Sequence, residues 1–299
     1  MLILLGYVIV IGSVLGGYAM VGGHMGALYQ PAELVIIFGA GIGAFVASSN
    51  GKGIAATLRV MPKLLRGSKY SKEVCVDLMT LLYLLLAKAR QSGMMSLEQD
   101  IENPAESTLF AAYPRLLEDE LIMPFLTDYL RLMISGNMDA FEIESLMDHE
   151  IETFQHEAEI PAHGLAAMSD SLPAFGIVAA VMGVVHALGS AALDPAGIGP
   201  LIAHAMVGTF LGVLLAYGFV SPLAARVRSQ VEEVVKIMQS VKVTLLANLN
   251  GYAPPLSIEF GRKALFSAER PSFVELEEHV RAVKSGGSST ATTADASAT

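Results

Sequence analysis

Four long apolar stretches constrain this chain more than any other feature of its sequence. They cover roughly residues 1–21, 34–50, 171–191 and 201–221. Each approaches the ~20 apolar residues that a helix needs to cross the ~30 Å hydrocarbon core of a bilayer. Because lipid offers no hydrogen bonds to a backbone, such stretches fold as helices. The sequence therefore predicts four transmembrane helices.

The composition agrees with a membrane protein. Only 16% of the 299 residues are charged and 53% are hydrophobic, whereas a soluble domain has about 25% charged residues. The first stretch has no basic residues ahead of it and another follows closely, so it is expected to be a retained helix rather than a signal peptide. A single cysteine, Cys75, excludes an intramolecular disulfide framework and predicts a half-buried, reduced thiol.

The Lys and Arg residues predict the orientation. None occurs in residues 22–33 or 192–200, whereas six lie between Lys52 and Lys72 with no acid among them. Since basic loops stay in the cytoplasm, residues 51–169 and 223–299 are expected there, with both chain termini. The basic stretch is expected to lie against anionic lipid headgroups of the membrane.

The predicted fold is an all-α membrane protein with four transmembrane helices in two hairpins. The hairpins are residues 1–50 and 170–222, with a large helical cytoplasmic domain, 51–169, between them. A cytoplasmic helical extension, 223–284, follows the second hairpin. The low-complexity tail, 285–299, is expected to lack regular structure.

Local patterns support the helical assignment. Residues 78–90 and 125–134 repeat apolar side chains at helical spacing, and Asp139/Glu142 and Ser272/Glu275 have the spacing of capping boxes. The fourth span is expected to continue as one helix until Asn250-Gly251. Four prolines are expected to interrupt the cytoplasmic helices: Pro104, Pro114, Pro124 and Pro161.

No enzymatic motif is complete in this sequence. The glycines of GAGIGAF (39–45) lie inside an apolar span without a preceding strand, which favours close helix packing over a nucleotide loop. His149 and His156 lack the companions of a metal motif. We expect no enzyme, no cofactor, no metal site and no nucleic-acid partner.

Ionisable groups inside membrane spans usually mark ion paths. Here the spans contain only His186 and His204, while Glu33 and Asp170 are expected at span edges, in contact with water. No acid is expected at mid-membrane. If this protein conducts ions, a partner helix must therefore supply the carboxylate.

The third and fourth spans have features that suit a polar neighbour. Thr209 lies near the middle of the fourth span, and small residues recur in both. These residues allow close helix approach, although ordinary packing, with Thr209 bonded to its own helix, explains the pattern as well. Pro173 and Pro222 lie at the cytoplasmic ends of these spans, where a proline makes either a hinge or a static kink.

Longer motifs carry a resemblance to a known family. They include MLILLGYVIVIGSVLGGY, GALYQPAELVII, DSLPAFGIVAAVMGVVHALGS, LIAHAMVGTFLGVLLAYGF and FGRKALFSAERPSFVELEEHVRAVK. The chain resembles, from residue 1 to about 284, the MotA family of flagellar motor stators in the MotA/TolQ/ExbB proton channel superfamily. The resemblance implies a ring of five copies around two MotB chains. MotB supplies a transmembrane aspartate and a peptidoglycan anchor, and the coupling ion is the proton.

The same resemblance implies roles for individual residues. Thr209, Ala180 and Tyr217 would surround the partner aspartate. Pro173 and Pro222 would couple its protonation to movement of the cytoplasmic part. The cytoplasmic charges would contact the rotor protein FliG, through Arg90, Glu98 and Glu150.

Three alternatives remain at this point. An energy transducer of the ExbB or TolQ type usually has three spans, against the four predicted here. A self-sufficient channel or transporter would need its own intramembrane charged group. A structural membrane scaffold would make no use of a proton gradient.

Overall fold

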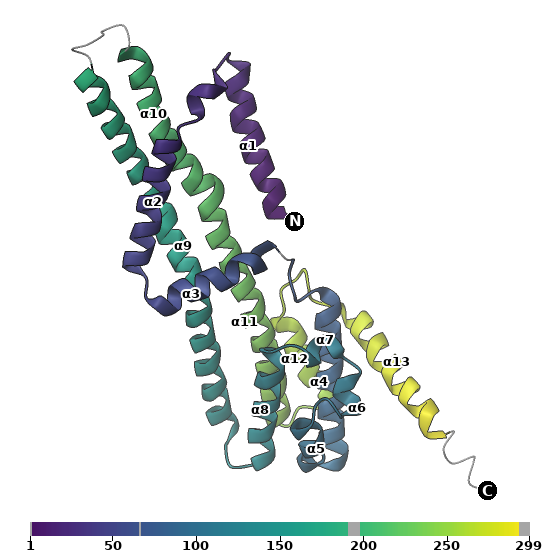
Figure 1. Cartoon of the computed structure of the whole chain (residues 1–299). Helices are drawn as coiled ribbons and strands as arrows, with labels where there is room; N and C mark the ends of the chain where they lie inside the picture. Colours follow the sequence, from purple (N-terminus) through teal and green to yellow (C-terminus); the bar gives the residue numbers. More distant parts are fainter. Residues whose placement is uncertain (1, 66, 191–197, 293–299) are drawn as a thin grey trace. The chain divides into compact units, whose positions relative to one another are not determined.

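The computed structural model describes residues 2–65, 67–190 and 198–292 of the chain. The described residues form helices joined by turns, without a β-strand, which confirms the predicted all-α fold (Figure 1). The chain divides into two compact units. We call residues 1–67 and 156–231 the membrane unit, and residues 68–155 and 232–299 the helical domain.

The membrane unit contains the predicted spans. Four helical segments are long and apolar enough to cross a bilayer, which confirms the predicted number. Its elements are α1 (Leu2–Met20), η1 (Met25–Leu28), α2 (Pro31–Ser48), α3 (Gly51–Val60), η2 (Met61–Leu65), the later part of α9 (Ala140–Ser190), α10 (Ile198–Leu215), the π-helical turn η5 (Ala216–Val220) and the start of α11 (Ser221–Leu249). Most of the predicted outer loop 192–200 lies outside the described residues.

Helix α9 differs from the prediction. It runs without interruption through Pro161 and Pro173, although Pro161 was expected to interrupt the pattern. A proline inside a helix costs ~3 kcal/mol because it removes one backbone hydrogen bond. Neighbouring Ala162 and Leu165 are buried, and this packing holds the helical path past the proline. The third span is therefore the end of a 51-residue helix.

Helix α2 packs against α9 through small residues. A β-carbon on Gly41 would lie 2.7 Å from Cδ2 of Leu172, and one on Gly164 would lie 2.7 Å from the ring of Phe45. The expectation of close packing is confirmed at Gly41. Gly39 and Gly43 have no atom within 4 Å of such a β-carbon.

The helical domain is built around α4 (Lys72–Ser92), whose apolar face is fully buried. Cys75 belongs to this face and is 0% exposed, so it is more buried than expected; burial, with the charge of Glu269, raises the pKa of its thiol to about 12. The other elements are η3 (Met94–Leu97), α5 (Glu98–Glu102), α6 (Thr108–Ala111), α7 (Pro114–Leu117), α8 (Ile122–Ser135), the start of α9, the later part of α11, α12 (Pro254–Ala264) and α13 (Phe273–Thr292).

Both capping boxes are present. The Asp139 and Glu142 side chains each accept the other's backbone N–H, at 2.8 and 2.9 Å, and Ser272 and Glu275 do the same at 3.2 and 3.3 Å. Helix α11 ends at Leu249, just before Gly251 at φ 87°.

The tail differs from its prediction. Helix α13 continues to Thr292, beyond the expected boundary at residue 285, because extending an existing helix costs far less than nucleating one. Residues 293–299 lie outside the described part.

Candidate functional site

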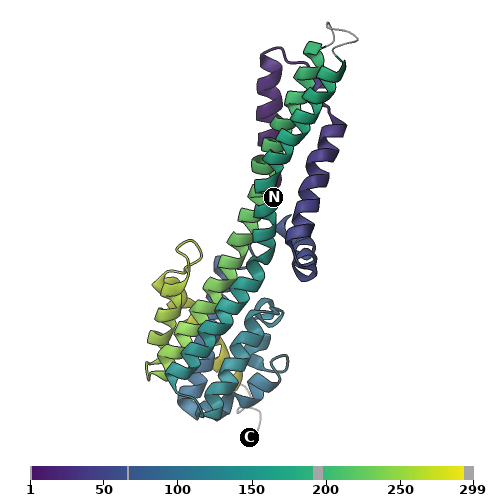
Figure 2. The same ribbon diagram turned by 90° about the vertical axis from the view of Figure 1, so that its left-hand side faces the viewer.

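Helices α9 and α10 cross backbone to backbone in the membrane unit. A β-carbon on Gly176 would lie 2.7 Å from the carbonyl oxygen of Gly208 and 3.0 Å from Cα of Gly212. One on Gly183 would lie 2.7 Å from Cβ of Ala205. Only glycine allows this approach, as at small-residue contacts between membrane helices. The two helices, teal and green, lie side by side in both views (Figures 1 and 2).

The crossing brings Ala180 and Thr209 to one level. Thr209 Cα lies 3.3 Å from the position of a β-carbon on Gly176, and the backbone nitrogen of Ala180 lies 3.2 Å from one on Gly208. Thr209 is exposed, on the same face of α10 as the exposed Met206 and Val213. This face therefore presents a hydroxyl group on an otherwise apolar surface.

The fourth span contains a π-helical turn that the sequence did not reveal. Pro222 follows η5 and has no backbone N–H for the carbonyl of Gly218, so the helix widens ahead of it. Two side chains bond to this turn: Ser169 donates to the carbonyl of Ala216 at 2.9 Å, and the Tyr7 hydroxyl donates to that of Phe219 at 2.8 Å. Pro222 was the only signal for this turn in the sequence.

The surroundings of the two prolines are connected. The carbonyl of Leu172, next to Pro173, lies 2.7 Å from the position of a β-carbon on Gly212. One turn earlier in α9, Ser169 bonds to the π-helical turn ahead of Pro222. Tyr217, in that turn, is 60% exposed. The residues beside the two prolines are thus linked by direct contacts between α9 and the fourth span.

Glu33 contradicts its prediction. It was expected in water at a span edge, but it is 8% exposed and lies within the apolar segment Met25–Ser48. The preceding η1 already packs against α10, so α2 begins part-way along α10 instead of at its end (Figures 1 and 2). The apolar stretch MGAL ahead of Pro31 was the available signal.

The other ionisable groups of the spans agree better with expectation. Asp170 is exposed, and His186 is exposed on α9. His204 lies in α10, and its side chain lies outside the described part of the chain.

Two of the predicted rotor residues lie at one end of the helical domain. Arg90, in the last turn of α4, is exposed and donates to the carbonyl of Tyr252 at 3.4 Å. Glu98 is exposed at the start of α5, joined to α4 through η3. Glu150 lies on a different element, α9, and accepts a 2.7 Å hydrogen bond from Tyr129. Burial, together with this bond, raises the pKa of Tyr129.

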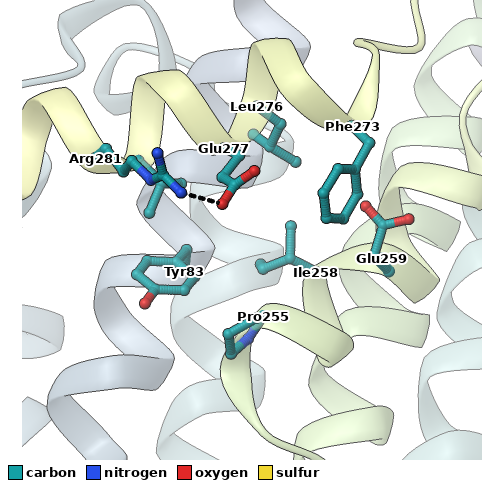
Figure 3. A pocket seen from close by; sticks show the side chains of 9 residues that line it. Tyr83, Pro255, Ile258, Glu259, Phe273, Leu276, Glu277 and Arg281 are labelled. Atoms are coloured by element: carbon teal, nitrogen blue, oxygen red, sulfur yellow. Dashed lines mark hydrogen bonds and ion pairs between the residues drawn. The ribbon is translucent and has the colours of Figure 1, made fainter.

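The helical domain also contains a cavity of ≈ 230 Å³ between α4, α12 and α13 (Figure 3). Tyr83, Ile258 and Phe273 line it, and the 2.7 Å ion pair between Arg281 and Glu277 lies beside it. None of the predicted site residues lines this cavity. It belongs to the packing of α13 on the domain.

These observations define a class of protein before any comparison. Four apolar spans and a glycine-packed helix crossing that leaves a hydroxyl on an exposed helix face are features of a multi-pass membrane protein.

Comparison with known proteins identifies the family. Residues 4–93 match the model "Motility protein A N-terminal", and residues 117–240 match the "MotA/TolQ/ExbB proton channel family". The chain is 67% identical to motility protein A of Salmonella typhimurium over 95% of this chain and 96% of that protein. It is 66% identical to that of Escherichia coli, over 98% and 99% respectively. The chain belongs to the motility protein A family.

Solved structures agree in fold. A chain of the C. jejuni MotAB structure matches with a TM-score of 0.75 at 19% identity, over 90% of this chain and 98% of that chain. A chain of the Bacillus subtilis flagellar MotAB stator complex matches with a TM-score of 0.70 at 24% identity, over 86% and 92%. The chain therefore shares the fold of these two chains, and it is a multi-pass membrane protein of the motility protein A family.

Proposed function

We propose that this chain is the membrane subunit of a proton-driven flagellar stator, which with a MotB-type partner converts proton flow into torque on the rotor protein FliG. The observation that carries the proposal is 66–67% identity to two motility proteins A over nearly the whole chain. The two solved structures compared above are both described as MotAB, which supports a MotB-type partner.

The geometry supports a partner-supplied carboxylate. The exposed face of α10 offers the Thr209 hydroxyl beside Ala180 and carries no acid. A transmembrane helix with an aspartate would place its carboxyl group against this hydroxyl, as polar groups pair between membrane helices. In the proposed assembly, five copies of the chain form a ring around two such partners in the inner membrane. Both termini then lie in the cytoplasm, on the side of the basic stretch.

The proposed coupling element is the junction of α10 and α11. One charge that crosses 100 mV releases about 2.3 kcal/mol, enough to shift a small two-state element. The element proposed for this role is the π-helical turn ahead of Pro222, to which Ser169 bonds. Protonation of the partner aspartate would change its contacts with α9 and α10. Helix α9, and α11 after the π-helical turn, each contain residues of both units.

The proposed rotor contacts are weak. Arg90, Glu98 and Glu150 are exposed, and exposed ion pairs contribute only about 0–1 kcal/mol each. Such contacts form and break repeatedly, and they steer the approach of an oppositely charged surface.

Complementation of an Escherichia coli strain without its own motility protein A tests this function. The wild-type chain should restore swimming, whereas Thr209→Leu should not, because a bulky apolar side chain removes the hydroxyl from the partner-facing surface. Gly43→Ala, at a position without contacts within 4 Å, is the matched control and should swim normally. Failure of the wild-type chain to restore swimming, when it is present in the membrane with the host's MotB, would overturn the proposal.

A further inference from the structure

Glu33 is a buried acid that the proposed function does not use. It is 8% exposed, and its Oε2 atom is buried without a hydrogen-bond partner among the described residues. An ionised carboxylate is very costly to bury alone. A carboxyl group in this place must therefore be accompanied by a proton or a cation, and ionisable groups within spans are a common mark of an ion path.

The carboxyl group of Glu33 reaches the crossing of α9 and α10. A β-carbon on Gly208 would lie 3.1 Å from Glu33 Oε2 and 3.1 Å from Cβ of Ala179. Gly208 thus leaves the space that the carboxyl group occupies. Its neighbours in sequence and space are Thr209 and Ala180, so the acid lies at the level of the predicted ion path, on the α2 side of the crossing.

The position along α2 places Glu33 far from the basic side of the membrane. About 15 residues separate it from Ser48, which is roughly 22 Å of helix. Lys52 follows in α3. Since the hydrocarbon core is ~30 Å thick, Glu33 lies inside it, within reach of the opposite side.

We propose that Glu33 is a proton-binding site that this chain itself contributes to the ion path. The carboxylate takes one proton from water on the side away from Lys52 and becomes a carboxylic acid. It then gives this proton to the carboxylate of the partner helix, and no other bond changes. The direction of transfer rests on the proposed function.

Other titratable groups on the same helices differ from Glu33 in exposure or position. Asp170, His186 and Tyr217 are exposed. The acids and the histidine of α9 near the other end of α2 precede Leu172 in this helix by more than one turn. These acids and this histidine of α9 are Glu157, Glu159 and His163. His24 is exposed, and the side chain of His204 lies outside the described residues.

The proposal is tested by measuring, as a function of pH, the proton flux into vesicles that contain the chain in complex with a MotB-type partner. Glu33→Gln keeps the size of the side chain but carries no exchangeable acid, so flux should fall about a hundredfold, the lower end for a positioned proton-transfer group. Its pH profile should also lose one titration step. Glu33→Asp should restore that step. Glu157→Gln, at an exposed acid of α9, should match the wild type.

A second test does not depend on flux: the infrared C=O band of protonated carboxyl groups is measured in the purified chain as a function of pH. The band of a buried protonated acid should be lost in Glu33→Gln and shifted in Glu33→Asp. Flux profiles of wild type and Glu33→Gln that superimpose, or a band that Glu33→Asp leaves unchanged, would overturn the proposal. A wild-type complex without flux would count against the proposed function, and the infrared band would still decide the role of Glu33.

Discussion

Asp119 is the most completely bonded acid in the helical domain, with a side chain 0% exposed. Its Oδ2 accepts from the Lys69 ammonium and the Tyr70 hydroxyl, both at 2.9 Å. Its Oδ1 accepts from the backbone N–H groups of Leu121 and Ile122, at 3.0 and 3.1 Å. Burial alone would raise the pKa of Asp119, but these four hydrogen bonds together hold it below its ordinary value of 3.8.

Asp119→Asn should therefore lower the free energy of unfolding by about 3 kcal/mol at neutral pH, because it removes a buried charge from its partners. A group with a lowered pKa in the folded state stabilises above its ordinary pKa and loses this contribution as the pH falls through the folded-state value. The difference between wild type and variant should thus persist at neutral pH and shrink below about pH 4. Thermal unfolding of the purified chain, followed by circular dichroism, measures it. Asp128→Asn, at an acid 64% exposed, is the control, and an equal loss there would contradict the account.

Single residues show what the sequence could predict. Thr209 and Ala180 were identified through family resemblance, and their proximity follows from small residues that recur on both spans. Glu33 was misplaced because an acid two positions after a proline is typical of an exposed first turn of a helix. Its burial depends on where η1 and α2 pack on α10, and the apolar stretch MGAL ahead of Pro31 was the one local signal of that depth.

At the scale of elements, the close α9–α10 crossing predicts that a methyl group added at the contact destabilises the protein. Gly176→Ala would place a methyl group 2.7 Å from the Gly208 carbonyl, so the helices must separate at a cost of about 1–3 kcal/mol. Gly43→Ala adds the same methyl group where nothing lies within 4 Å. Because both changes gain the same helix propensity, the difference in melting temperature of the two purified variants reports the contact. Equal melting temperatures would show that the crossing is looser than described.

The elements that cross the membrane were predicted well from the sequence. The four spans follow from hydropathy because only a helix satisfies its backbone in hydrocarbon. The continuity of α9 through Pro161 was not predicted, since tertiary packing overrode a local breaker. The π-helical turn was not predicted either, because Pro222 by itself is compatible with a hinge or a kink, and Ser169 and Tyr7, whose side chains bond to the turn, are distant in sequence.

At the scale of the whole molecule, the proposed function assigns ion conduction to the membrane unit and rotor contact to the helical domain. Arg90→Glu reverses an exposed charge in the helical domain, far in sequence from the spans. It should reduce the torque of tethered cells strongly while proton flux stays within about twofold of wild type, since an exposed contact is worth no more than ~1 kcal/mol to the fold. Lys263→Glu, at another exposed base, controls for the change in net charge. Loss of flux in Arg90→Glu would contradict this division of labour.

The central claim is that the chain conducts protons only with a partner's carboxylate. Proton flux into vesicles, measured first with the chain alone and then with its MotB-type partner, tests it most directly. The account predicts flux only in the presence of the partner, and loss of that flux when the partner's transmembrane aspartate is replaced by asparagine. Flux through the chain alone would contradict it, and would show that Glu33 or the histidines of the spans form a complete path by themselves.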